Sequence, residues 1–222
     1  CGKTSSVMDF AKKNYRHVVY LDFREHPEYR NFFIPNLDIP SIILRISATM
    51  PDVEIEAKET CFVFDEIQDC PRARGALKYF YLDGNYEVMC TGSLLGVNGY
   101  KTKEELQDES EASIPVGFEQ IENMYPMDFE EWLWANNIKP IHLTYLRKCF
   151  DEELPVDEAI HQRMRELLHL YAIVGGMPEA VSTFLATNQI GTLLQVQRRI
   201  VDEYKSDMIK YALPTDKSKI RE

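Results

Sequence analysis

The chain has 222 residues, enough for one or two domains with hydrophobic cores of their own. Its 36 acidic and 25 basic residues give a net charge of −11, which argues against direct binding of nucleic acid, because that needs a surplus of Lys and Arg facing phosphate. The mean hydropathy is −0.33, and no apolar run is long enough for a membrane span or a secretory signal, so we expect a cytoplasmic protein.

The sequence begins within a motif typical of phosphate-binding loops. Gly2-Lys3-Thr4 matches the second half of G-x-x-x-x-G-K-[ST], whose first glycine would precede Cys1. Apolar side chains at helical spacing predict a helix over 4–15, with its N-terminus facing phosphate. We expect the strand that precedes such a loop to lie outside the printed sequence. The nucleotide-binding candidates are Gly2, Lys3, Thr4 and Ser5.

Two short apolar runs predict buried parallel strands, over 18–23 and 61–65. The second run is closed by Asp65 and Glu66, at the end of a strand where open α/β sheets bind ligands. In nucleotide hydrolysis, Asp65 would hold Mg²⁺ and Glu66 would orient and deprotonate the attacking water. The alternative is that the two acids simply leave the strand for a surface turn.

The run that ends at Asp65 is also the first strand of a predicted strand–helix–strand unit. The pattern predicts a helix over 71–83, ended by Gly84, and a further strand from Tyr86. That connection is expected to be right-handed, with parallel strands. The strand ends at Thr91 and Ser93, whose hydroxyls could contact a γ-phosphate or the attacking water.

The second half of the chain reads as a polar stretch followed by helices. Residues 96–113 predict a loop or short helix over the nucleotide face, and the alternation over 114–124 predicts a final strand. Helices are then expected from Asp128 through Trp134, from Asp157 to Ala172, from Pro178 onward and over 190–211. This part predicts a helical lid.

Taken in order, these motifs resemble those of the prokaryotic AAA-type P-loop ATPases of unknown function, in which an ATPase module precedes a further C-terminal domain. The resemblance implies an α/β fold: a P-loop NTPase parallel sheet, with its first strand missing here, followed by an all-helical lid subdomain. The first strand of such a sheet is central, so the resemblance also implies that a sheet without it has a gap in its middle. It implies a core over 1–125, a lid over 126–212 and the start of a further segment over 213–222, in a chain truncated at both ends. The matching blocks are Gly2-Lys3-Thr4, Phe64-Asp65-Glu66-Ile67-Gln68, Thr91-Gly92-Ser93, residues 125–132 and residues 171–178.

The leading interpretation is an ATPase that uses ATP and Mg²⁺. Lys3 would neutralise the β- and γ-phosphates, Thr4 would ligate Mg²⁺ directly with Asp65 holding the ion's water shell, and Glu66 would be the base. Thr91 or Ser93 would sense the γ-phosphate. The alternatives are a nucleotide-controlled switch with negligible turnover, and an ATPase that serves a nucleic-acid-acting C-terminal domain.

Partners are less well defined by the sequence. The alternatives for a protein partner are a homo-oligomer and a different protein. A ring ATPase needs a cation for the transition state. Arg72 and Arg74 could supply it from a subunit edge; the other candidates are Arg163, Arg165, Arg198 and Arg199.

The cysteines and histidines predict neither disulfides nor a zinc site. The cysteine count is odd, no C-x-x-C spacing occurs, and no two histidines are spaced i, i+4. Reduced thiols are typical of the cytosol. The five cysteines are Cys1, Cys61, Cys70, Cys90 and Cys149.

Overall fold

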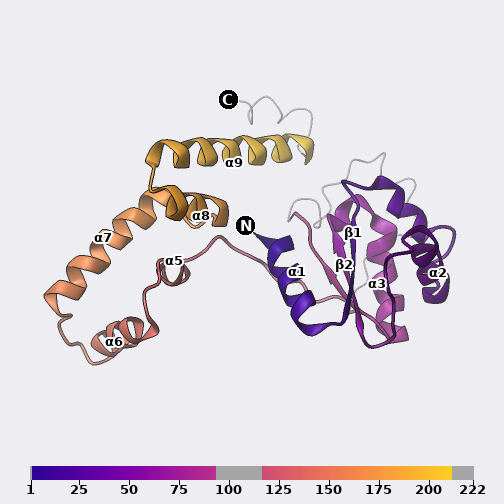
Figure 1. Ribbon diagram of the computed structural model, residues 1–222, viewed down its shortest axis with the longest axis horizontal. Coiled ribbons are helices and arrows are strands. Elements are labelled where there is room, and N and C mark those ends of the chain that lie inside the picture. The colour runs from indigo at the N-terminus through magenta and orange to yellow at the C-terminus, as the bar shows by residue number, and fades with distance from the viewer. Residues whose placement is uncertain (1, 94–116, 212–222) are drawn as a thin grey trace. The chain divides into compact units, whose positions relative to one another are not determined.

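The computed structural model describes residues 2–93 and 117–211 (Figure 1). Residues Gly2–Glu122 and Asn123–Asp207 form two compact units, and each is described by itself below. The expected loop or helix over 96–113 and the segment over 213–222 lie outside the described residues.

The first unit is built on a parallel sheet with the strand order β1-β2-β3. The strands are β1 (His17–Asp22), β2 (Thr60–Asp65) and β3 (Glu87–Cys90), and all six residues of β2 are buried. The expectation of a gap in the middle of the sheet is wrong for these strands: they pair contiguously, because each helical crossover returns the chain to the neighbouring position. Among the described residues, β3 pairs with β2 alone.

Helices cover both faces of this sheet (Figure 1). On one face α1 (Lys3–Asn14) packs its Ala11 against Cys61 and Val63 of β2. The other face carries α2 (Ile39–Thr49), α3 (Pro71–Asp83) and the 3-10 helix η1 (Pro27–Phe33).

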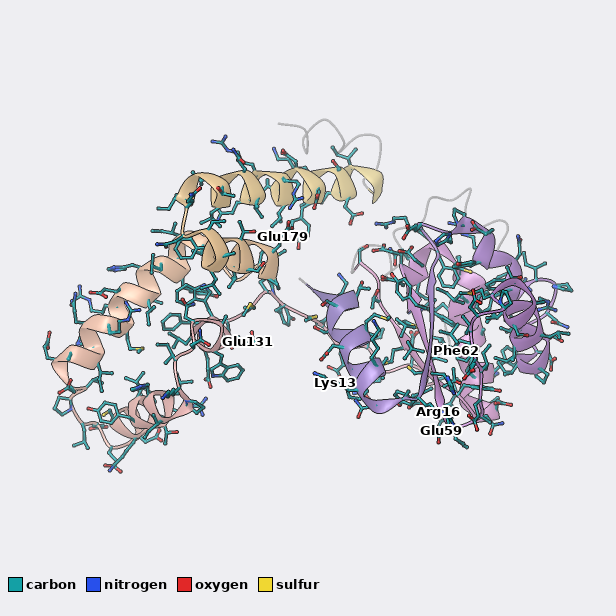
Figure 2. The ribbon with its side chains drawn as sticks, viewed as in Figure 1. Lys13, Arg16, Glu59, Phe62, Glu131 and Glu179 are labelled. Atoms are coloured by element: carbon teal, nitrogen blue, oxygen red, sulfur yellow. The ribbon has the colours of Figure 1, made fainter. Side chains whose placement is uncertain are left out.

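Alternation along β2 decides which side chains meet which helix. Phe62 lies inside this unit (Figure 2), with its ring centroid 5.3 Å from that of Phe80 on α3. Because successive side chains of a strand point to opposite faces, Val63 and Asp65 share the face that α1 covers. The strand therefore delivers its terminal carboxylate to the N-terminal turn of α1.

The sequence-based boundaries of this unit are largely confirmed. The helix expected over 4–15 is Lys3–Asn14, and the helix expected over 71–83 is Pro71–Asp83. Gly84 ends the latter with a φ of 64°, a left-handed conformation that suits glycine. The two strands flanking α3 are also confirmed.

The final strand expected over 114–124 is wrong for its described part, since residues 117–124 form no strand. Ile121 is 56% exposed, so the alternation does not reflect a buried sheet face. The segment is instead held by side chains of α3. The ring of Phe118 packs edge-on against Tyr81 at 5.5 Å, and Glu119 forms a shielded ion pair with Arg74 at 2.7 Å.

The second unit consists of helices that pack around a separate core. Asp128 begins α5 (Phe129–Ala135) with a capping box that includes Glu131, and Asp157 caps α7 (Glu158–Val174), as the sequence predicts. Trp132, Leu167 and Leu193 are buried in the core. The sequence analysis missed α6 (Pro140–Asp151); the expected helices α8 (Pro178–Thr187) and α9 (Ile190–Tyr211) are confirmed.

A backbone contact joins the start of this unit to the turn between α7 and α8. The N–H of Met127 donates to the carbonyl of Gly176 at 2.7 Å, and the Tyr171 hydroxyl donates to the carbonyl of Met127 at 2.9 Å. A Cβ on Gly176 would lie 2.0 Å from that Met127 oxygen. The block over 125–132 and the block over 171–178 therefore meet directly, and the contact requires glycine at position 176.

Candidate nucleotide site

The candidate site lies at the carboxyl ends of the parallel strands. Asp22 and Asp65 are register partners at the ends of β1 and β2, and Thr91 directly follows β3. The backbone links these ends as well, since the N–H of Ile67 donates to the carbonyl of Thr91 at 3.0 Å. Ligands of open α/β sheets bind at such an edge.

Asp65 is the acceptor on which the site converges. Its carboxylate accepts hydrogen bonds from the hydroxyl of Thr4 at 2.9 Å and the hydroxyl of Tyr20 at 2.7 Å, both at Oδ2. Oδ1 accepts from the hydroxyl of Thr91 and, at 3.0 Å, from the N–H of Glu66. The residue is only 5% exposed. Four hydrogen bonds thus tie α1 and all three strands to one carboxylate.

These contacts keep the carboxylate of Asp65 ionised. Burial raises the pKa of Asp65, but the hydrogen bonds from Thr91, Tyr20 and Thr4 outweigh it and hold the pKa below its usual value. The anionic oxygen lies within hydrogen-bond distance of the Thr4 hydroxyl. Both are the hard oxygen donors that Mg²⁺ prefers.

The donor set fits Mg²⁺ bound together with phosphates rather than a metal held by protein alone. No group of three or more His, Cys, Asp or Glu suited to a metal occurs within residues 2–93 and 117–211. Mg²⁺ commonly takes one or two protein oxygens and completes its octahedron with waters and substrate phosphates. Thr4 and Asp65 would hold such an ion.

Glu66 sits in an unusual backbone conformation next to this carboxylate. Its φ is 53°, in the left-handed region that non-glycine residues rarely adopt and that recurs at functional sites. Burial raises the pKa of Glu66, the charge of Arg24 and the hydrogen bond from Gln68 lower it, and the net pKa lies above the usual value. A carboxylate with raised proton affinity suits a general base.

Two neighbours hold Glu66 by the same oxygen. Arg24 pairs with Oε2 of Glu66 at 2.5 Å and with Asp69 at 3.2 Å. The amide nitrogen of Gln68 also donates to Oε2 of Glu66, at 2.5 Å.

The other end of the Gln68 amide, Oε1, is shielded from solvent and has no hydrogen-bond partner among the described residues. Leaving such a group unpaired costs about 1–3 kcal/mol.

The residues expected to bind phosphate surround the start of α1. Gly2 caps the helix with a φ of 83°, and its carbonyl accepts the N–H of Ser6 at 3.0 Å. Lys3 is the first helical residue and Ser5 is exposed in the first turn. The hydroxyl of Thr4, which lies between these two residues, donates to Asp65.

Directly after β3, the hydroxyl of Thr91 donates to Asp65. Ser93 lies two residues farther along and is half-buried.

Sequence reasoning missed Tyr20 and Arg24. Tyr20 lies two residues before the end of β1 and therefore on the same face as Asp22, a period-2 signal that points it toward the strand end. Its hydrogen bond to Asp65 also depends on the register between β1 and β2, which the sequence does not encode locally. Arg24 lies just beyond β1, with no motif to mark it.

Four of the six arginines proposed as transition-state cations are engaged within the chain. Arg72 donates to the carbonyls of Phe33 and Pro35, each at 2.9 Å, which fixes the segment after η1. Arg74 holds Glu119 through two nitrogens. In the helical unit, Arg163 pairs with Glu166, and Arg199 pairs with Glu179, which Figure 2 labels.

The cysteines lie apart from this chemistry. The four described ones, Cys61, Cys70, Cys90 and Cys149, are free thiols. Burial raises the pKa of Cys61 and of Cys70 to about 11, so both are protonated near neutral pH. Within the described residues, no helix has the length and apolar character that crossing a membrane requires.

Residues 1–133 match a family model described as an AAA domain. The chain belongs to the AAA domain family. Comparison with curated proteins and with solved structures gives no match. Membership identifies an AAA-type, P-loop ATPase-like module with an α/β fold and a helical part, and it implies nucleotide binding, usually with Mg²⁺. The matched range of the AAA domain includes Asp65 and the residues that donate hydrogen bonds to its carboxylate, here called the Asp65 network: Thr4, Tyr20, Glu66 and Thr91.

Proposed function

We propose that this AAA domain binds ATP with Mg²⁺ and hydrolyses it to ADP and phosphate. The observation that carries the proposal is the hydrogen bond between Thr4 and Asp65, 61 positions apart, beside the partly buried Glu66. A hydroxyl from the phosphate-loop helix and a strand-end carboxylate are the pair that P-loop enzymes use for Mg²⁺.

Each residue has a distinct role in this proposal. Lys3, at the N-terminus of α1, neutralises the β- and γ-phosphates, and Gly2 allows the backbone to approach them. Thr4 and Asp65 hold the ion, which when bound neutralises charge that develops on the phosphates. Thr91, and Ser93 beyond it, sense the γ-phosphate, and Ser5 adds a hydroxyl to the first turn of the loop helix.

Glu66 takes a proton from the attacking water. The water oxygen forms the new bond to the γ-phosphorus while the bond to the β,γ-bridging oxygen breaks, and ADP leaves. The raised pKa of Glu66 strengthens it as a base. We further propose that residues 1–125 form the catalytic core and that the helices within 126–212 act as its lid subdomain.

The test compares two glutamates at opposite ends of β2 in the natural full-length protein. Glu66→Gln is expected to lower phosphate release by at least about 10²-fold, the contribution of a general base, while ATP still binds. Glu59→Gln is the control, because Glu59 is exposed and immediately precedes β2 (Figure 2). Unchanged phosphate release in the Glu66 variant would overturn the assignment of the base.

A second candidate is a nucleotide-controlled switch with negligible turnover. The ion pair from Arg24 to Glu66 favours it, because a paired carboxylate is a weaker base than a released one. Steady-state phosphate release by the unmodified protein separates the two candidates: sustained release supports the ATPase, and ATP binding without release supports the switch.

A further inference from the structure

The amide of Gln68 is the shielded polar group at the site that the roles above leave unused. It follows Glu66 by two residues, on the 3-10 helix η2 (Ile67–Asp69). Its nitrogen donates to Oε2 of Glu66 at 2.5 Å, while its oxygen is shielded and has no hydrogen-bond partner in the described part of the chain. Shielded polar atoms are almost always paired, so an unpaired one indicates a missing partner.

The orientation of this amide follows from the contact with Glu66. An amide oxygen placed 2.5 Å from a carboxylate oxygen would bring two acceptors together, whereas the NH₂ group donates. The nitrogen must therefore face Glu66, and Oε1 is left as an acceptor that needs a donor. The other group that contacts Oε2 of Glu66 is Arg24. Its guanidinium has hydrogen-bond donors only, so it cannot accept a hydrogen bond from a ligand, whereas Oε1 of Gln68 can.

We propose that Gln68 is a positioning residue for the attacking water. This inference rests on the proposed ATPase function. Its nitrogen orients Glu66 through Oε2, and its oxygen accepts one hydrogen of the water whose other proton passes to Glu66. A water molecule supplies the donor that Oε1 requires, and two acceptors fix its orientation toward the γ-phosphorus. Binding of ATP itself does not require the amide.

The experiment replaces Gln68 by methionine, which keeps the length and shape of the side chain and removes both polar atoms. Gln120→Met is the matched control, because Gln120 also donates its amide to a glutamate two residues on, at 2.6 Å, but on an exposed segment. Steady-state phosphate release, equilibrium binding of a non-hydrolysable ATP analogue and the thermal midpoint are measured on the full-length protein.

A positioning role predicts that kcat in Gln68→Met falls on the order of 10²-fold, since a small misplacement of a reacting group has that effect. KM and analogue affinity remain as in the wild type. The thermal midpoint changes little, because the unpaired buried oxygen and the hydrogen bond from the amide nitrogen to Glu66 are removed together, and their effects on stability oppose each other. In a Glu66→Gln background the same change adds no further loss, because Gln68 acts through Glu66 and its water.

Two results would overturn the inference while leaving the ATPase intact: wild-type kcat in Gln68→Met, or a fall in kcat that is accompanied by equal losses of analogue affinity and thermal stability. A wild-type protein that binds the analogue but releases no phosphate would instead refute the proposed function, and the inference with it. A fall in kcat in Gln120→Met as well would show that the loss in Gln68→Met comes from replacing glutamine by methionine and not from the position of Gln68 at the site, which would also overturn the inference.

Discussion

The pairing of Arg24 with Glu66 makes a quantitative prediction about turnover. Arg24→Met retains the apolar stem and removes the charge that contacts Glu66 at 2.5 Å and Asp69 at 3.2 Å. The Arg24 side chain is 46% exposed, so solvent screens its ion pair with Glu66. The interaction free energy of this pair therefore lies at the upper end of the range for exposed ion pairs, about 1 kcal/mol.

That magnitude limits how much activity the substitution can release. A free-energy change of about 1 kcal/mol corresponds to roughly a fivefold shift in an equilibrium. If release of Glu66 from Arg24 limits the chemical step, kcat for phosphate release rises by up to about fivefold in Arg24→Met, with KM unchanged. Steady-state phosphate release at saturating ATP measures the effect.

The control is Arg16→Met, because Arg16 pairs with Glu56 at 3.4 Å before the start of β1, at the other end of the strand (Figure 2). Its turnover should match that of the wild type. A fall in kcat of the Arg24 variant would refute the reasoning, since it would mean that Arg24 assists the reaction rather than restraining the base.

Two further predictions concern stability, measured by urea or thermal denaturation. Tyr20→Phe removes a hydrogen bond to an ionised carboxylate and should lower the unfolding free energy by about 1.5–3 kcal/mol, whereas Tyr79→Phe, on the exposed face of α3, should change it by less than about 0.5 kcal/mol. Equal effects of the two would contradict the Asp65 network. Gly176→Ala places Cβ 2.0 Å from the Met127 oxygen and should lower the unfolding free energy by at least about 2 kcal/mol, the contribution of the two hydrogen bonds at Met127. The control, Gly191→Ala, has open space around its Cβ and should not lower the unfolding free energy. A Gly176 variant as stable as the wild type would show that this backbone contact is dispensable.

The parts of the fold that the sequence predicted are those with local signals. Pro71 and Gly84 bracket α3 because one suits the first turn of a helix and the other the left-handed end. Asp128 and Asp157 begin helices because their carboxylates accept backbone N–H groups of the first turn. The strand expected over 114–124 failed for the opposite reason. Alternation is a local pattern, but a strand also needs a partner, and in the described part of this segment the side chains contact α3 instead.

The residues of the candidate site also fall into two groups: those that a local sequence pattern predicts and those that only tertiary contacts bring to the site. Asp65 and Glu66 were predictable because a strand-end acid pair has a recognisable local pattern, and Thr4 because the phosphate loop has one. Tyr20 and Arg24 were not, because each reaches the acids only through the pairing of β1 with β2, a contact between residues more than 40 positions apart. The sequence thus predicts the groups that would bind Mg²⁺ and accept the proton. How strongly Glu66 is restrained depends on residues that only the folded sheet brings to it, so the turnover rate of the proposed ATPase would depend on the tertiary structure.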